Sequence, residues 1–323
     1  MLKKIGLGLL GLIVVLAIVF AVGPRPQAEI VTAFDASTLG DDLDAYLADN
    51  EAAFDDLKDG QGKQIIWANG AKGEKTDLSV VYVHGFSASS GEIRPVPDRV
   101  AADLGANLFF TRLTGHGRSG DAMAEATAAA WMDDLAEAIA IGERLGEGVV
   151  LITTSTGGTL AKAGYSVDGL MDKVAGVVFV SPNFKIKNAM APLLTAPWAA
   201  SVLPALTGSE RSFEPLNEAH ATLWTTQYPT AALFPMAALV KETAKIDDAT
   251  ISVPALFVFD DGDMVVDAAT TRQVAANWGG PSQIVTLENN DDPFKHVIAG
   301  DALSPSTNDE AVDAMVKWAR EAH

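Results

Sequence analysis

The sequence predicts an α/β fold in which a doubly wound, mostly parallel sheet carries a helical cap insertion and follows an N-terminal transmembrane helix. Three observations lead to this prediction. Short Val-, Ile- and Phe-rich runs alternate with helical patterns, about 70 residues between Pro182 and Ile251 are apolar but contain no clear strand, and an uncharged apolar run lies near the N-terminus. Such alternation is typical of a sheet covered by helices on both faces. We divide the chain into a membrane anchor or signal segment (1–25), an introductory region (26–75) and a main domain (76–323) with its cap at 183–250.

The N-terminal apolar run extends from Ile5 to Val22 and follows Lys3 and Lys4. Its 18 residues would span about 27 Å as a helix, which is close to the hydrocarbon thickness of a bilayer. The lysines are expected to stay on the cytoplasmic side, so the rest of the chain would lie on the exported side. Cleavage as a signal peptide, with secretion of the domain, is the alternative, but Pro24 just beyond the run favours an uncleaved anchor.

The strands and helices are predicted from residue type and periodicity. The introductory region contains an acidic amphipathic helix at 39–57 and an edge strand at 64–68. Buried strands are predicted at 78–84, 107–113, 148–154, 174–180, 254–260 and 283–287, and helices at 129–145, 159–170, 268–278 and 309–322. The cap is rich in Ala, Leu, Pro, Trp and Met, which is too apolar for a disordered loop, so we expect it to pack over the carboxyl edge of the sheet.

The composition excludes several kinds of site. The 323 residues include 42 acidic and 23 basic side chains, and the net charge of −19 argues against nucleic-acid binding because phosphates would be repelled. The chain has no cysteine, which excludes disulfides, a thiolate nucleophile and cysteine-ligated zinc. The sequence indicates no metal or organic cofactor.

Ser155 is the candidate nucleophile, within Thr153-Thr-Ser-Thr-Gly-Gly158 between a predicted strand and a helix. A serine on such a tight turn presents its hydroxyl at the carboxyl edge of the sheet, and the helix N-terminus directs N–H groups toward developing negative charge. The usual pattern of this turn is Gly-x-Ser-x-Gly, and Thr153 stands where the first glycine is usual. A Thr- and Ser-rich helix N-cap is the alternative interpretation.

The candidate base and acid lie later in the chain. His296 follows Ser155 and the late aspartate cluster and lies beyond the last predicted strand. Of the other four histidines, His84, His116 and His220 precede the aspartate cluster, and His323 is the last residue. Among Asp260, Asp261 and Asp263 we favour Asp263, because it lies past a glycine turn and directly before an apolar run. A carboxylate at this place orients the histidine and stabilises its imidazolium.

An oxyanion hole is predicted from two backbone N–H groups. The loop after the first buried strand begins His84-Gly-Phe86, and we expect the N–H of Phe86 to provide one donor. The N–H of Thr156, which follows the candidate nucleophile, is expected to provide the other. His84 itself is expected to have a structural role.

These residues resemble those of the α/β-hydrolase superfamily, within the branch of monoacylglycerol lipases, bacterial carboxylesterases and serine aminopeptidase-like proteins. The resemblance covers about residues 76–320 and implies an α/β-hydrolase fold with the triad order Ser, Asp, His. It is carried by His84-Gly-Phe86, Gly115-His-Gly-Arg-Ser119, Ser155-Thr-Gly-Gly158, Asp263-Met-Val-Val266 and His296.

We therefore predict a membrane-tethered serine hydrolase that cleaves carboxylic esters through an acyl-enzyme. The apolar cap favours small-molecule substrates with short or medium acyl chains, or monoglyceride-like lipids. A serine aminopeptidase-type peptidase is an alternative, for which Glu210, Glu214 and Glu218 of the cap are candidate ligands of a substrate ammonium. A non-catalytic tethered binding protein is a further alternative, disfavoured because all three triad residue types are present.

Overall fold

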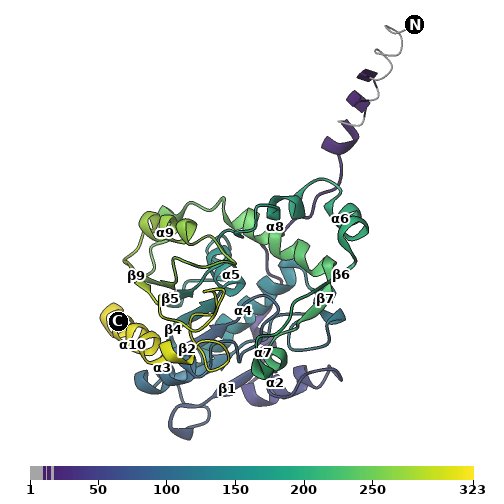
Figure 1. Ribbon diagram of the computed structural model, residues 1–323. Coiled ribbons are helices and arrows are strands. Elements are labelled where there is room, and N and C mark those ends of the chain that lie inside the picture. The colour runs from purple at the N-terminus through teal and green to yellow at the C-terminus, as the bar shows by residue number, and fades with distance from the viewer. Residues whose placement is uncertain (1–9, 12, 16–17) are drawn as a thin grey trace, which may run out of the picture.

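A seven-stranded sheet forms the centre of the computed structural model, which describes residues 10–11, 13–15 and 18–323. The strand order is β1-β3-β2-β4-β5-β8-β9, and the strands are parallel except for the edge strand β1, which pairs antiparallel with β3 (Figure 1). The predicted mostly parallel sheet is thereby confirmed. The strands are β1 (Gln64–Ile66), β2 (Thr76–Val83), β3 (Asn107–Phe110), β4 (Gly146–Thr154), β5 (Val174–Val180), β8 (Ala255–Phe259) and β9 (Ser282–Thr286).

Helices cover both faces of the sheet because successive strand residues point to opposite sides. Val81 and Val83 of β2 belong to a core shared with α4 (Ala128–Leu145), α5 (Thr156–Gly164), α9 (Ala268–Asn277) and α2 (Leu43–Glu51). Val80 and Tyr82, which alternate with them, belong to a second core shared with α3 (Val96–Leu104) and α10 (Asn308–Ala322). The strand residues are therefore apolar on both faces, which explains the continuous apolar runs in the sequence.

The introductory helix is shorter than predicted. The sequence pattern indicated a helix over 39–57, whereas α2 begins after Asp42, whose carboxylate accepts hydrogen bonds from the N–H groups of Asp44 and Ala45. This cap fixes the start of the helix. Leu43 and Leu47 are its buried residues.

The insertion between β5 and β8 forms a cap with helices α6 (Ala199–Thr207), α7 (Glu218–Leu223) and α8 (Leu233–Thr243). It also contains a small antiparallel sheet of β6 (Glu210–Ser212) and β7 (Gln227–Pro229), which the prediction of a helical cap did not include. Each of these strands has only three residues and no apolar run, which leaves no sequence pattern to detect. The N–H of Thr225, just before β7, donates to the carbonyl of Ser87 (2.7 Å) and ties the cap to the loop after β2.

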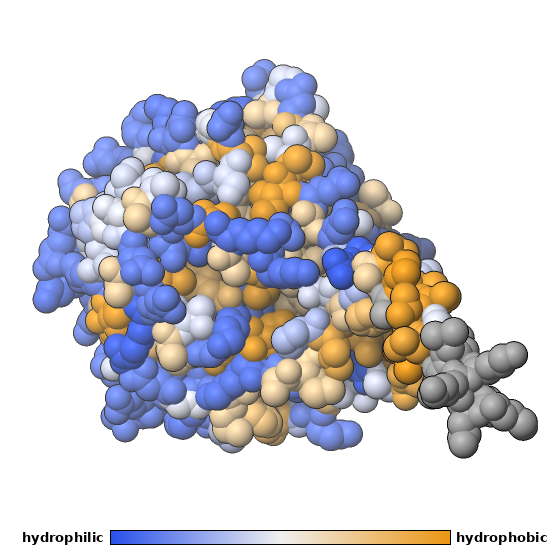
Figure 2. All heavy atoms as spheres, turned by 90° about the horizontal axis from the view of Figure 1, so that it is seen from above, coloured by the Kyte–Doolittle hydropathy of each residue, from blue (hydrophilic) through white to orange (hydrophobic). Residues whose placement is uncertain are grey.

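The N-terminal apolar segment meets the cap at Trp198. The backbone N–H of Trp198 donates to the Pro24 carbonyl (2.7 Å), and its indole Nε1 donates to the Val19 carbonyl (3.0 Å). Described residues between Leu10 and Ala21 have helical backbone, and Figure 2 shows apolar side chains gathered on this segment. The predicted membrane-spanning run at 5–22 lies partly outside the described residues. Within the part that is described, no helix is both long enough and apolar enough to cross a membrane.

Candidate active site

Ser155 lies at the junction of β4 and α5, where the backbone turns sharply. Its φ of 50° and ψ of −111° are strained for a residue with a side chain, at a cost on the order of 1–3 kcal/mol. Backbone hydrogen bonds hold the turn: the N–H of Ser155 donates to the Val180 carbonyl (3.0 Å), and its carbonyl accepts from Asn183 (2.9 Å) and Gly158 (3.0 Å). The surrounding backbone therefore fixes the strained conformation.

Small residues let α5 approach the sheet closely after this turn. A Cβ atom at Gly157 would lie 2.2 Å from the Val83 carbonyl oxygen, and one at Gly158 would lie 2.9 Å from a proline side chain. Thr153, which stands where glycine is usual, is buried in β4, and its hydroxyl donates to the Val178 carbonyl (2.9 Å). The sheet thus satisfies the threonine hydroxyl, and the turn forms with threonine at this position.

The structure brings Ser155, His296 and Asp263 into one hydrogen-bonded series. Nε2 of His296 lies 3.1 Å from Oγ of Ser155, and Nδ1 of His296 lies 2.8 Å from Oδ2 of Asp263. The other oxygen of Asp263, Oδ1, accepts hydrogen bonds from the backbone N–H groups of Val265 (2.7 Å) and Val266 (2.9 Å). All three side chains are buried. This is the geometry in which a carboxylate orients an imidazole toward a hydroxyl.

The neighbouring aspartates have other partners. Asp260 accepts the N–H of Gly262 (2.7 Å) and the side-chain amide of Asn290 (2.7 Å). Asp261 forms an exposed ion pair with Arg272. Among the described residues, Asp263 is therefore the aspartate whose side chain bonds to the His296 ring.

The pKa of His296 lies above the ordinary histidine value. Burial opposes protonation of the ring, but the hydrogen bond and negative charge of Asp263 outweigh it, and Glu92 and Asp292 add to the increase. Asp292 is fixed by the backbone N–H groups of His296 (3.0 Å) and Val297 (2.9 Å). Three carboxylates thus favour the imidazolium form of a single buried ring.

Two buried side chains hold the loop after β2. The N–H of Gly85 donates to Oε2 of Glu92 (2.7 Å), and the N–H of Ser87 donates to Nε2 of His116 (3.0 Å). These bonds fix the peptide groups 84–85 and 86–87. The same Glu92 oxygen also accepts the hydroxyl of Tyr82 (2.9 Å), so the loop is anchored to the central sheet.

Both predicted oxyanion donors border the cavity next to Ser155. In the described part of the chain, the N–H groups of Phe86 and Thr156 donate to no other group. Phe86 comes from the loop after β2, and Thr156 begins α5, where the helix N-terminus adds partial positive charge. The two N–H groups are therefore available to an oxygen atom of a ligand.

The histidines beside this loop are neutral. Burial lowers the pKa of His84 to about 3 and that of His116 to about 4. Nε2 of His84 accepts the N–H of Leu113 (3.1 Å), so its Nδ1 carries the proton and donates to the Gly85 carbonyl (2.9 Å). His84 thus supports the loop, in keeping with the structural role expected of it.

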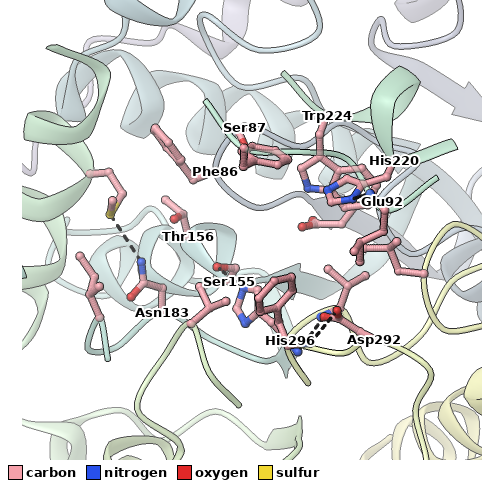
Figure 3. A pocket seen from close by; sticks show the side chains of 18 of the residues that line it. Phe86, Ser87, Glu92, Ser155, Thr156, Asn183, His220, Trp224, Asp292 and His296 are labelled. Carbon is pink, nitrogen blue, oxygen red and sulfur yellow. Dashed lines mark hydrogen bonds between the residues drawn. The ribbon is translucent and has the colours of Figure 1, made fainter. Parts of the chain in front are cut away.

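A cavity of about 280 Å³ opens over Ser155. Phe86, Thr156 and Asn183 lie on one side of this serine, and His296, Asp292, Glu92, His220 and Trp224 lie on the other (Figure 3). Apolar side chains complete the wall: Ile186, Phe213, Leu216, Tyr228, Met236 and Leu303. The cavity can therefore receive a ligand with apolar parts and a few polar groups.

The sequence did not predict that Glu92, His220 and Asp292 line this cavity. Asp292 lies four residues before His296, so the contact of its side chain with that backbone was a local possibility. Glu92 lies in a polar loop and His220 in the cap, and no pattern around either residue indicates burial. The burial of Glu92 depends on donors ten and seven residues earlier in the chain, at Tyr82 and Gly85.

The cap glutamates do not lie where a peptidase would need them to bind a substrate ammonium. Glu210, Glu214 and Glu218 are exposed and do not line the cavity, so their assignment as ligands of a substrate ammonium is wrong. Among the residues that the structure describes, no three His, Asp or Glu side chains are arranged to hold a metal ion.

Comparisons with known proteins agree with this architecture. One of the metagenome-derived lipolytic enzymes LipS and LipT is 19% identical, with a TM-score of 0.67 over 82% of this chain and 99% of that chain. A soluble variant of monoglyceride lipase from Saccharomyces cerevisiae is 12% identical, with a TM-score of 0.63 over 81% and 91%. The monoacylglycerol lipase of Paleococcus ferrophilus is 18% identical, with a TM-score of 0.57 over 81% and 98%. At these identities the similarity establishes the fold.

A search of curated proteins finds no match. Residues 74–289, more than half of the chain, match the family described as serine aminopeptidase, S33. This range contains Ser155, Asp263 and the whole cap. The chain therefore belongs to the serine aminopeptidase family S33, and it is a serine hydrolase of the α/β-hydrolase superfamily.

Proposed function

We propose that this serine hydrolase cleaves carboxylic esters through an acyl-enzyme on Ser155. The observation that carries the proposal is the series Ser155–His296–Asp263, with bonds of 3.1 and 2.8 Å, next to two unengaged backbone N–H groups. A base within hydrogen-bonding reach of a hydroxyl activates it as a nucleophile. Asp263 holds the imidazole in the tautomer that leaves Nε2 free to accept the proton.

The reaction has two halves. Oγ of Ser155 attacks the carbonyl carbon while Nε2 of His296 takes the hydroxyl proton, and the N–H groups of Phe86 and Thr156 stabilise the oxyanion, at about 3 kcal/mol for each donor. The ester C–O bond breaks as His296 gives its proton to the departing alcohol. Water then attacks the acyl-enzyme with His296 as base, and the carboxylic acid leaves as Ser155 regains its proton.

The walls of the cavity favour a substrate with an apolar acyl part. Its apolar side chains suit an acyl chain of short or medium length, or a monoglyceride-like lipid. Proteins of similar fold include lipolytic enzymes and monoglyceride lipases, which supports the same substrate class. The cap glutamates that were candidate ligands of a substrate ammonium are exposed and outside the cavity, so they provide no aminopeptidase site.

Labelling with a fluorophosphonate probe, followed by peptide mapping, tests the proposed nucleophile and substrate class together. We expect covalent modification of Ser155 and turnover of esters across a series of acyl lengths. The matched panel contains p-nitroanilide amides of the same acyl groups and aminoacyl p-nitroanilides. Turnover of the amides alone would reject the ester assignment, and a folded but unlabelled protein would reject catalysis by Ser155.

The raised pKa of His296 predicts the pH profile. The base must be neutral to accept a proton, so kcat/KM is expected to fall as the pH drops through a value above 6.5, the ordinary histidine pKa. Ester hydrolysis measured from pH 5 to 9 gives this midpoint. A midpoint below 6.5 would show that the carboxylates near the ring do not govern its ionisation.

The proposed location is the exported side of a membrane, with the N-terminal segment as an uncleaved anchor. The support is the sequence itself, in which Lys3 and Lys4 precede an apolar run of 18 residues. The full chain is expected to stay in a carbonate-washed membrane fraction, whereas a variant lacking residues 1–25 should be released. Recovery of a shortened, soluble protein from cells expressing the full chain would favour the secreted alternative.

A further inference from the structure

Glu92 presents a carboxylate oxygen that has no role in the proposed triad. Only 2% of the residue is exposed, and Oε2 accepts hydrogen bonds from the N–H of Gly85 (2.7 Å) and the hydroxyl of Tyr82 (2.9 Å). Oε1 has no partner within the described residues, and Glu92 lines the cavity. Because Oε2 is fixed by two donors, Oε1 is held rigidly at the cavity wall. Burial raises the pKa of Glu92 to about 7, so Oε1 is an acceptor once the pH exceeds this value.

His220 presents the complementary group from the cap. Its Nδ1 accepts the backbone N–H of Leu216 (3.1 Å), so the proton of the neutral ring is on Nε2. The ring packs against Phe213 (centroids 5.3 Å apart) and Trp224 (4.8 Å), which holds its orientation. Burial lowers its pKa, which keeps the ring uncharged. His220 lines the same cavity, and Nε2 has no partner in the described structure.

Both groups lie on the side of Ser155 where an alcohol would depart. Figure 3 places Glu92 and His220 on the same side of Ser155 as His296. Electrostatic interactions agree with this placement. The negative charge of Glu92 contributes to raising the pKa of His296, and that of Asp292 opposes the lowering of the His220 pKa, so these groups lie near one another. Since Nε2 of His296 must protonate the leaving oxygen, the alcohol part of an ester has to lie on this side.

We propose that Glu92 and His220 form an alcohol subsite for leaving groups that carry at least one additional hydroxyl. A hydroxyl both donates and accepts hydrogen bonds, so it matches an acceptor and an N–H donor on one wall. An ammonium group only donates, and it would leave the N–H of His220 unpaired. A plain alkyl group would leave both polar groups unpaired in a desolvated site, which is costly.

The test rests on the proposed ester hydrolysis and compares substrates that share one acyl group. Full-length protein in detergent is assayed with 1-octanoylglycerol, propyl octanoate and 3-aminopropyl octanoate, at a pH well above the pKa of Glu92 so that its carboxylate can accept. We expect kcat/KM for the glycerol ester to exceed that for the propyl ester by about tenfold or more, as one or two hydrogen bonds to buried polar groups imply. The measured quantity is the ratio of the two values, since this ratio cancels effects on the triad.

Two variants test the two halves of the subsite. In Glu92→Gln the amide oxygen can still accept from Gly85 and Tyr82, but an NH2 group replaces Oε1 at the cavity wall. In His220→Asn the side-chain oxygen can still accept from Leu216, but no donor replaces Nε2. Each variant is expected to lower the glycerol-to-propyl ratio several-fold. The exposed Glu214→Gln serves as the matched control and should keep the wild-type ratio.

The outcomes separate the alcohol subsite from the proposed function. A wild-type ratio near one, variants that slow both esters equally, or a preference for the aminopropyl ester would overturn the subsite while ester hydrolysis stands. Absence of turnover for all three esters, in protein whose Ser155 reacts with a fluorophosphonate, would overturn the proposed function and the subsite with it.

Discussion

Ser155→Ala is expected to lower kcat for ester hydrolysis by about 10⁶-fold, the scale seen when a triad serine is removed from a serine protease. Without Oγ no acyl-enzyme can form. The two unengaged N–H groups and the cavity remain, so a small residual rate above that in water is expected. The comparison of kcat for purified wild-type and variant protein, with active-site titration of the wild type, measures the effect.

The fold should tolerate this change. Alanine has the same Cβ as serine, so the strained backbone at this position is unchanged. Within the part of the chain that the structure describes, the one side-chain hydrogen bond lost is that to His296. Thermal unfolding should therefore remain close to that of the wild type. Ser119→Ala is the matched control, because Ser119 is an exposed serine that bonds to Asp56 (2.8 Å) away from the cavity. A Ser155→Ala variant that retains activity within tenfold of the wild type would place the nucleophile elsewhere.

Asp263→Asn is expected to lower kcat by about 10⁴-fold with little change in KM. The structure dictates how the new amide must lie. Its oxygen has to take the place of Oδ1, because the N–H groups of Val265 (2.7 Å) and Val266 (2.9 Å) donate there. The NH2 group then occupies the place of Oδ2 and donates to Nδ1 of His296.

This orientation puts the imidazole in the unproductive tautomer. With Nδ1 accepting a hydrogen bond, the proton of the neutral ring is on Nε2, which then cannot accept the proton of Ser155. Steady-state kinetics above the pKa of His296 measure the loss without interference from protonation of the ring. Asp261→Asn, which removes an exposed partner of Arg272, should retain wild-type kinetics. A loss for Asp263→Asn of less than tenfold would argue that the ring is oriented by another group.

The sheet could be predicted because its strands carry a local pattern. The run 174–180 is apolar throughout, and the structure places β5 at the same residues. The helix α3 escaped prediction because Pro95 and Pro97 at its start resemble a turn, although proline is well suited to the first turn of a helix. The strands β6 and β7 escaped because three-residue strands have no periodicity, and their pairing depends on residues far apart in the chain.

The same distinction applies to the candidate site. The positions of Ser155, Asp263 and His296 relative to predicted strands suggested their proximity, because parallel strands end at one edge of a sheet. Glu92 could not be found in this way. Its burial results from donors on β2 and on the following loop, and a single glutamate in a polar loop ordinarily faces solvent.

The uncharged state of His84 and His116 makes folding itself sensitive to acid. In the unfolded chain each ring gains a proton as the pH falls through 6.5, whereas the folded protein excludes these protons until the pH approaches about 3 for His84 and about 4 for His116. The unfolded state therefore binds more protons in this window, and each histidine lowers the free energy of unfolding by about 1.4 kcal/mol per pH unit. The raised pKa of His296 offsets part of this loss, because that ring binds its proton more tightly in the folded state. The two rings beside the loop after β2 thus set a lower pH limit for the fold, and acid would unfold the protein by protonating these buried groups.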